Sequence, residues 1–368
     1  MVTPADPLPA ASRANTAAAR SLDAGMASLV RSAQLIGADW GSTGLRLFLI
    51  GADGAVLDTR ASAQGSTAMN GSADAYRAAL DTLAGDWLAA APELPLVVCG
   101  MAGSKHGWHE VPYATCPAEV DNLLALAPPL PALAITPPSR SISAPAPAAE
   151  HAGGTHPLAI IPGLLYAPDD GTPDVMRGEE TQIAGALALH PQLAAQACVV
   201  MPGTHSKWTQ LRDGTVRAFA THMTGELFAL LTQHSVLNRL MIASSAPSRA
   251  AFEQGVKAAR DNASANLANQ LFAVRTLGLT EKLPGDALAD YMSGLLIGHE
   301  LRAGLAWREE AGLQQAPLIL IGEPALCTRY EQALAVFGIK ADHNFPNTAP
   351  AGLWAMARRA GLITGAKT

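Results

Sequence analysis

The chain has 368 residues, of which 49% are hydrophobic and 15% charged, and its formal net charge at pH 7 is −6. This composition is typical of a globular protein with room for two domains, and it excludes a largely disordered chain. The negative charge argues against nucleic acid or an anionic membrane as a partner, and Pro, Gly or charged residues interrupt every apolar stretch. Four scattered cysteines without CxxC spacing predict buried thiols in a reducing cytosol, and hence a cytoplasmic protein.

Residues 1–33 are rich in Ala, Ser and Pro and have no hydrophobic period. They lack the basic segment and the sustained apolar core of a signal peptide. We therefore expect a disordered extension, or an overcalled start of the chain, and place it outside the fold.

The first strand signals surround the string DWGSTGLR, which begins at Asp39. Residues 35–38 and 45–50 read as buried strands, and a GADG turn leads into a third strand. The Rossmann and Walker phosphate loops are excluded because they run from a strand into a helix. In the corner itself, Gly41 and Gly44 allow close backbone approach, the hydroxyls of Ser42 and Thr43 can donate, and Asp39 can hold a hydrated Mg²⁺. An ordinary Gly-rich hairpin explains this motif equally well.

The same design returns half a chain later, in the string VMPGTHSKWTQLRDGTVRAFA. A buried strand at 197–201 runs into a corner with Gly203, Thr204, His205 and Lys207, and two further strands follow. Two such corners facing each other across a cleft would grip the β- and γ-phosphates of a nucleotide, and Lys207 would add a cation. A solvated turn lysine and a surface histidine are the alternative interpretations of Lys207 and His205.

Long and unusual strings give the chain a resemblance to the 2-dehydro-3-deoxygalactonokinases, a family within the sugar-kinase, hsp70 and actin superfamily. The resemblance covers about residues 35–362. It rests on the strings DWGSTGLR, GMAGSKHGWHEVPY, IIPGL, DVMRGEETQIAGA, VMPGTHSKW, MTGEL and SGLLIGHE.

The resemblance implies an α/β fold with two ribonuclease-H-like (actin-like ATPase) domains, a mixed five-stranded sheet in each, and a nucleotide and sugar cleft between them. We expect the first domain at 34–190 and the second at 191–368, with the last helix crossing back. The implied reaction is phosphorylation of the C6 hydroxyl of 2-dehydro-3-deoxy-D-galactonate, with ATP and Mg²⁺ as cofactors and Asp39 as the metal ligand. It would serve galactonate degradation.

The resemblance also implies the position of the catalytic base. Related carbohydrate kinases have a Gly-Asp or Gly-Glu pair just upstream of the second phosphate hairpin, and its carboxylate acts as the base. In this chain these residues are Gly178 and Glu179, so Glu179 is the expected base and Glu180 the alternative. Many relatives have Asp here. From the residues alone, acidic side chains are simply favoured in a first helical turn. Successive helix positions differ by about 100°, so only one of the pair can point into a cleft.

A sugar acid needs a partner for its carboxylate, and a bidentate guanidinium is well suited to it. Arg177 is the first candidate and Arg46 the second, although a salt bridge within the first domain also explains Arg46. The glycine turn at Gly322 is expected beside the adenosine. Loops that follow strands supply the remaining candidate sugar contacts, which are Asn70, Gly103, Ser104, Trp108 and Tyr113.

Two other functions stay open. One is a phosphohydrolase of the same superfamily, which would need no sugar pocket. The other is a non-catalytic regulator that binds a nucleotide or sugar; such a protein usually has a basic DNA-binding helix pair at one end, whereas this N-terminal segment is rich in Ala and Pro and has few charges. The expected partner is a small sugar acid, with no nucleic acid and no membrane, and a homodimer is left open.

Overall fold

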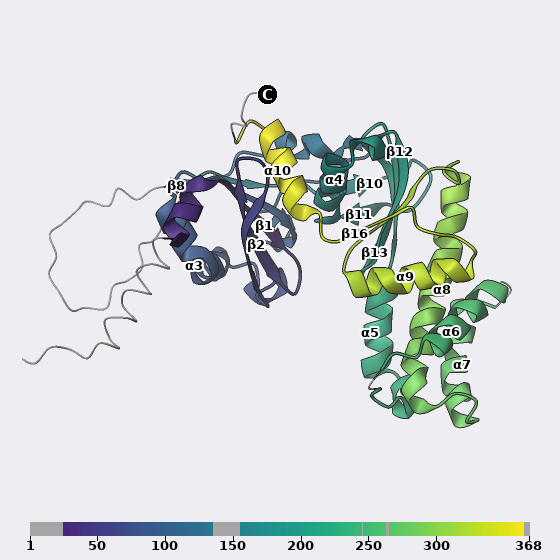
Figure 1. Ribbon diagram of the computed structural model, residues 1–368. Coiled ribbons are helices and arrows are strands. Elements are labelled where there is room, and N and C mark those ends of the chain that lie inside the picture. Colours follow the sequence, from purple (N-terminus) through teal and green to yellow (C-terminus); the bar gives the residue numbers. More distant parts are fainter. Residues whose placement is uncertain (1–24, 135–154, 245, 263–264, 364–368) are drawn as a thin grey trace, which may run out of the picture. The chain divides into compact units, whose positions relative to one another are not determined.

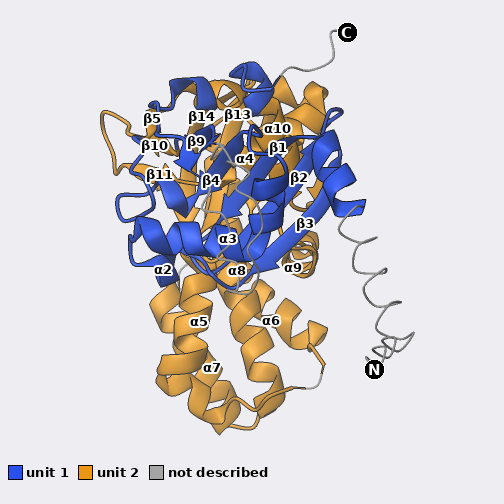
Figure 2. Cartoon of the chain, turned by 90° about the vertical axis from the view of Figure 1, so that its left-hand side faces the viewer, with its two compact units in different colours: residues 1–112, 124–162, 356–368 blue, residues 113–123, 163–355 orange. Residues whose placement is uncertain are grey.

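The computed structural model describes residues 25–134, 155–244, 246–262 and 265–363 (Figure 1). The chain forms two compact units (Figure 2): unit 1 holds residues 1–112, 124–162 and 356–368, and unit 2 holds residues 113–123 and 163–355. Each unit has its own sheet and its own hydrophobic core. None of the helices in the described ranges combines the length and apolar character that crossing a membrane requires.

The sheet of unit 1 has five strands in the order β3-β2-β1-β4-β9. The predicted antiparallel meander is confirmed as strands β1 (Ala33–Trp40), β2 (Leu45–Gly51) and β3 (Val56–Ser62). Two parallel strands extend it from β1, namely β4 (Leu96–Gly100) and β9 (Leu158–Ile160). A separate short pair consists of β7 (Leu133–Ala134) and β8 (Thr155–His156).

Helix α3 (Ala73–Ala90) supplies much of the core of unit 1. Its buried residues, such as Tyr76 and Trp87, pack with alternate residues of β1 and β2, because side chains on a strand point to opposite faces in turn. Residues 25–32 also form a helix, and Val30 is fully buried in this core. The expectation that residues up to 33 lie outside the fold is therefore wrong for 25–33, whereas 1–24 lie outside the described residues. One buried valine in an Ala-rich stretch gives no periodic signal.

The main sheet of unit 2 has six strands in the order β16-β15-β12-β13-β14-β6. The second meander is confirmed as β12 (Gln196–Met201), β13 (Ser206–Arg212) and β14 (Thr215–His222). Parallel strands follow on one side, β15 (Leu318–Ile321) and β16 (His343–Phe345). The sixth strand, β6 (Ala118–Glu119), was not predicted, since two residues are too few for a periodic pattern.

A smaller sheet of unit 2 has the order β11-β10-β5. Its strands are β5 (Ala114–Thr115), β10 (Leu164–Tyr166) and β11 (Asp174–Met176). This sheet explains why the compact units differ from the predicted boundary at residue 190: residues 113–123 and 163–190 pair and pack within unit 2.

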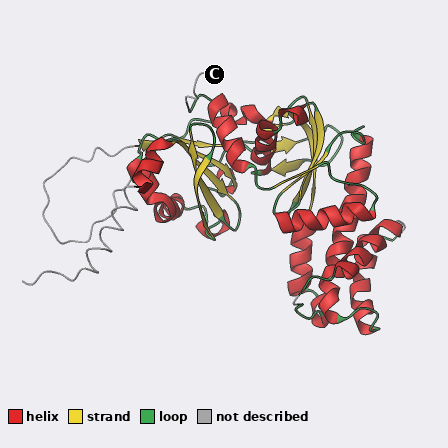
Figure 3. Cartoon of the chain, in the orientation of Figure 1, coloured by secondary structure: helices red, strands yellow, loops and turns green. Residues whose placement is uncertain are grey.

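Unit 2 also contains α-helices, which are red in Figure 3. They are α4 (Glu179–Leu189), α5 (Thr224–His234), α6 (Arg249–Asp261), α7 (Leu267–Leu279), α8 (Leu288–Glu310) and α9 (Pro324–Val336). Residues of α6, α8 and α9 pack with the six-stranded sheet, and a second cluster lies among α6, α7 and α8. Helix α10 (Ala349–Arg359) begins in unit 2, and the chain from residue 356 onward belongs to unit 1.

Glycines bring α4 and α10 into close contact. A Cβ on Gly185 would overlap the carbonyl oxygen of Thr348, and one on Gly352 would overlap that of Thr181. The contact fixes the helix that begins at Glu179.

Candidate active site

The first corner of unit 1 exposes Ser42 and Thr43 between β1 and β2. The amide of Gly41 donates to the carbonyl of Gly44 at 2.9 Å, which closes the turn. Among the described residues, the amides of Ser42 and Thr43 have no hydrogen-bond acceptor. Amides of this kind can form an anion-binding concavity.

Short helix α2 (Ser66–Met69) holds this corner from its carbonyl side. The amide of Ser66 donates to Gly41 O at 2.9 Å, and that of Thr67 donates to Ser42 O at 3.1 Å. Gly65 must be glycine here, because a Cβ would overlap Ser42 O. The loop 65–71 thus lies against the first corner, which was not predicted, and Asn70 is exposed at the end of α2.

Asp39 and Arg46 are cross-strand partners on β1 and β2. Their charged groups lie 3.7 Å apart, with the Asp39 side chain one-fifth exposed and that of Arg46 more than half exposed. Burial raises the pKa of Asp39, and the Arg46 cation and the Cys99 thiol oppose this shift. Arg46 therefore makes the salt bridge within unit 1 that was its alternative interpretation.

The loop 101–113 leaves the sheet beside the first corner, since Gly100 at the end of β4 pairs with Trp40 at the end of β1. Gly103 is buried within a turn of 3₁₀ helix, and Ser104 ends that turn. The Trp108 ring is only 6% exposed and stacks on Tyr76, with 5.7 Å between the ring centroids. This packing accounts for Trp108, and we leave it out of the proposed sugar contacts.

The second corner, in unit 2, repeats the pattern of the first. Thr204 and His205 are exposed, and the amides of Gly203, Thr204 and His205 have no hydrogen-bond acceptor among the described residues. Helix α5 holds this corner: Glu226 N donates to Thr204 O at 3.0 Å, and the Glu226 carboxylate lies 2.5 Å from His205 Nε2. Gly225 allows the approach, since a Cβ there would overlap Gly203 O.

Lys207 is buried, with 5% of its surface exposed, so it is not the solvated turn lysine of the alternative interpretation. Its Nζ donates to Val175 O and to Thr221 Oγ1, both at 2.8 Å. Thr221 in turn donates to Asp174 at 2.7 Å. No carboxylate of the described chain lies within salt-bridge distance of the ammonium, so a buried cation sits here with uncharged partners only.

Gly322 lies next to the second corner, because β12 and β15 are parallel neighbours that end at the same edge. A Cβ on Gly322 would lie 3.4 Å from Pro202 O. The glycine's amide donates to Phe345 O at 3.1 Å, and the next residue, Glu323, caps α9 by accepting from Leu326 N at 2.9 Å.

Three predicted residues of unit 2 come together where β11 leads into α4. The Arg177 guanidinium lies over the ring of Tyr113, 4.3 Å from its centroid. Arg177 is buried, Tyr113 is 39% exposed, and the amide of Arg177 donates to Glu179 Oε2 at 3.1 Å. Glu179 is half-buried. A cation and a half-buried carboxylate thus share one turn of the chain, and an aromatic ring from a distant segment stacks on the cation.

Glu180 has a different environment, fully buried at the start of α4. Both of its carboxyl oxygens accept from Gly178 N, at 2.9 and 2.7 Å. Burial, and next the charge of Glu179, raise the pKa of Glu180 to about 8. A group that is largely neutral at pH 7 is less suited than Glu179 to accept a proton.

This shift predicts a pH-dependent stability. Because the pKa of Glu180 rises from 4.5 to about 8 on folding, the folded protein binds more protons than the unfolded chain between these values. The contribution of Glu180 is complete below pH 4.5 and is lost as the pH rises through about 8. We expect a decrease in unfolding free energy on the order of 3 kcal/mol over this window.

The measurement is the melting temperature from pH 5 to pH 8.5, for the wild type, for Glu180→Gln and for Glu93→Gln as an exposed control. The decrease in melting temperature with rising pH should be smaller in Glu180→Gln than in the wild type, and unchanged in Glu93→Gln. Parallel curves for all three proteins would show that Glu180 is ionised in the folded state.

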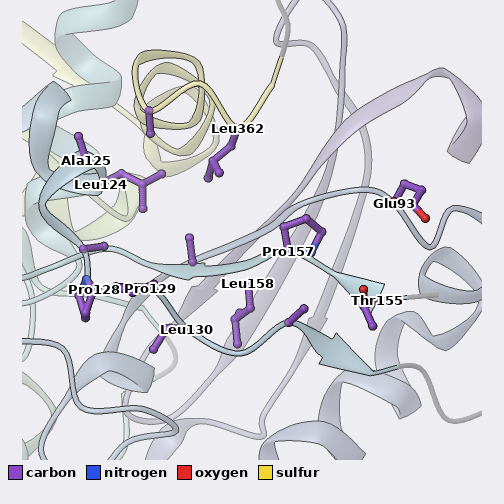
Figure 4. Close-up of a pocket in the computed structure, with 14 residues that line it drawn as sticks. Glu93, Leu124, Ala125, Pro128, Pro129, Leu130, Thr155, Pro157, Leu158 and Leu362 are labelled. Carbon is purple, nitrogen blue, oxygen red and sulfur yellow. The ribbon is translucent and has the colours of Figure 1, made fainter. Parts of the chain in front are cut away.

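The described residues contain no group of three or more His, Cys, Asp or Glu side chains that could hold a metal ion. A hollow of about 530 Å³ lies in unit 1 (Figure 4), and none of the predicted site residues lines it. Its lining is mostly apolar and includes Leu124, Leu130, Leu158 and Leu362. It carries no catalytic group.

Sequence reasoning missed two carboxylates of unit 2 that support the second corner, Glu226 and Glu300. Glu226 binds His205, and Glu300 accepts a hydrogen bond from Ser206 at 2.6 Å. Both residues belong to strings that carry the family resemblance, MTGEL and SGLLIGHE. A charged residue just after the apolar stretch SGLLIG could have indicated a role for Glu300. Nothing in the chain order indicated their partners.

Two strand-corner-strand meanders, whose corner amides include several without an acceptor in the described chain, and a helix that begins with a carboxylate are the features of a kinase. The family model of the 2-keto-3-deoxy-galactonokinases matches residues 39–356, and the chain belongs to this family.

The similar proteins have names that match this family. The "Probable 2-dehydro-3-deoxygalactonokinase DgoK1" of Rhizobium meliloti (strain 1021) is 37% identical over 310 residues, 82% of this chain and 89% of that protein. The 2-dehydro-3-deoxygalactonokinase of Escherichia coli (strain K12) is 34% identical over 307 residues, 83% of this chain and 91% of that protein. A crystal structure of a Sinorhizobium meliloti protein, provisionally described as a 2-dehydro-3-deoxygalactonokinase, has a TM-score of 0.70 and 34% identity, covering 88% of this chain and 98% of that one.

Proposed function

We propose that the chain transfers the γ-phosphoryl group of ATP to the C6 hydroxyl of 2-dehydro-3-deoxy-D-galactonate, giving 2-dehydro-3-deoxy-6-phosphogalactonate. Family membership and the names of the relatives support this substrate. The observation that carries the ATP part is the pair of corners, at 41–44 and 202–207, with exposed amides that have no acceptor in the described chain. The sheets around them, each a meander extended by two parallel strands, support ribonuclease-H-like domains.

Each corner has its own complement of donors in the proposal. In unit 1 these are the amides and hydroxyls of Ser42 and Thr43. In unit 2 they are the amides of 203–205, with His205 held by Glu226. The buried ammonium of Lys207 supplies positive charge behind the second corner, and its hydrogen bonds to Val175 and Thr221 leave one of its N–H groups for a further acceptor. A buried cation with uncharged partners is costly, and an anionic ligand would offset that cost. Gly322, beside Pro202, is the proposed neighbour of the adenosine.

Asp39 would hold the Mg²⁺ that accompanies ATP. The ion typically takes one or two protein carboxylates and fills its remaining positions with water and substrate phosphates, so a single carboxylate at the first corner fits. The bridge to Arg46 is long, at 3.7 Å, and exposed on the arginine side, so the carboxylate can exchange this partner. When bound, the ion would neutralise charge on the phosphates.

Glu179 is the proposed general base, which accepts the proton of the C6 hydroxyl as that oxygen attacks phosphorus. Its half-buried carboxylate and its position at the start of α4 support this role, whereas Glu180 is enclosed. Arg177, stacked on Tyr113, is the proposed partner of the substrate carboxylate. Four residues of unit 1 are proposed as further substrate contacts, with less support than Arg177: Arg46, Asn70, Gly103 and Ser104. The support is weaker because no interaction described in unit 1 orients these residues toward a substrate.

The test is ADP release from Mg²⁺-ATP with 2-keto-3-deoxygalactonate, with its gluconate epimer, and without sugar. Release that depends on the galactonate-derived acid is expected. Release without sugar would instead establish a phosphohydrolase. ATP binding without release under any condition would indicate a regulator.

A further inference from the structure

One buried carboxylate, that of Glu300 on α8, collects four hydrogen bonds and is 3% exposed. Its Oε1 accepts from Ser206 Oγ at 2.6 Å and from Trp208 Nε1 at 2.9 Å. Its Oε2 accepts from Thr224 Oγ1 at 2.5 Å and from Tyr330 OH at 2.7 Å. The donors come from β13, α5 and α9.

All four donors are uncharged, and no basic side chain of the described chain forms a salt bridge with Glu300. A carboxylate has about four lone-pair sites, so these donors satisfy it completely. Burial of a carboxylate is tolerable only with such bonding. An apolar residue would serve a plain core better, and the ionic group therefore needs another explanation.

The location of two of the donors offers that explanation. Ser206 directly follows the exposed corner residues, and Thr224 begins the helix whose next residues, Gly225 and Glu226, contact the corner. Glu300 thus joins both chain segments that shape the second corner. The hydroxyl of Ser206 donates its hydrogen bond to Glu300, and the amides of 203–205 have no acceptor in the described chain.

We propose that Glu300 is a positioning residue for ATP: through Ser206 and Thr224 it holds the second corner with its amides oriented toward the phosphates. This inference rests on the proposed function of the corner. It predicts that Glu300 affects the affinity for ATP without touching the nucleotide, and that the sugar acid is bound as before.

A matched pair of variants separates positioning from simple support. Ser206→Ala and Tyr330→Phe each remove one hydroxyl donor to Glu300, but only Ser206 belongs to the corner. Tyr330 OH also lies 3.4 Å from Ser206 Oγ, a much longer contact than the 2.6 Å bond that Ser206 keeps to Glu300. Both variants should lower the melting temperature by similar amounts.

Binding of Mg²⁺-AMP-PNP, measured by calorimetry, should weaken about tenfold in Ser206→Ala and less than about twofold in Tyr330→Phe. The KM for ATP should rise in parallel in Ser206→Ala, with an unchanged KM for the sugar acid. In Glu300→Gln the amide oxygen can still accept from Trp208 and Ser206, while its NH₂ turns to the rotatable hydroxyls of Thr224 and Tyr330, so much of the affinity should return relative to Glu300→Leu.

Equal affinities in Ser206→Ala and the wild type, or equal losses in Ser206→Ala and Tyr330→Phe, would overturn the proposal. Failure of the proposed function would look different, because the wild type would then bind no Mg²⁺-AMP-PNP or show no sugar-dependent ADP release.

Discussion

Replacement of Glu179 by Gln should lower kcat by at least about 100-fold, because a positioned general base typically contributes that much or more. Gln keeps the size of the side chain and can still accept from Arg177 N, as Glu179 Oε2 does at 3.1 Å. The affinity for Mg²⁺-AMP-PNP should therefore stay within about twofold of the wild type. Single-turnover phosphorylation and calorimetry measure the two quantities separately.

The neighbouring Glu180→Gln is the matched control. Its carboxyl is fully buried and bound to Gly178 N, so its loss should alter stability and not the chemical step. If Glu180→Gln lost the greater share of kcat and Glu179→Gln kept its rate, the roles of the two carboxylates would be exchanged. A variant of Glu179 with an unchanged rate would remove the residue from catalysis altogether.

Gly185→Ala should destabilise unit 2 by about 2–3 kcal/mol, although Ala is ordinarily the better helix former by up to about 1 kcal/mol. The added Cβ would overlap Thr348 O, a backbone atom that cannot rotate away. The helices α4 and α10 must then separate, and Glu179 at the start of α4 moves with them. Both the melting temperature and kcat should decrease.

Gly85→Ala is the comparison within another helix, α3, where an added Cβ meets nothing within 4 Å. It should be neutral or stabilise by up to about 1 kcal/mol. If both variants behaved alike in thermal unfolding, the close crossing of α4 and α10 would not exist in solution.

Local patterns predicted the two meanders, since buried runs, Gly/Thr corners and DG turns are all contained within short windows. What they missed depends on distant partners. The core position of Trp108 follows from Tyr76 and Trp40, and the burial of Lys207 follows from β11 and β14.

The candidate site shows the same division. The Glu179–Arg177 turn was predicted from a string, whereas the difference in burial and bonding between Glu179 and Glu180 was not. Glu300 lies 94 positions from Ser206, and no local pattern can link residues so far apart.

The path of the chain through unit 1 also affects the order in which the protein can mature on the ribosome. Unit 1 holds the N-terminal segment, but it also includes residues 124–162 and everything from residue 356 onward. Met356 and Ala357 are fully buried, and Leu362 lines a hollow together with Leu124 and Leu158. The last strand of the unit 1 sheet is synthesised by residue 160, but the unit receives its C-terminal segment only after residues 163–355 of unit 2 have emerged. A chain shortened by its last turns would lack a part of the unit that was synthesised first.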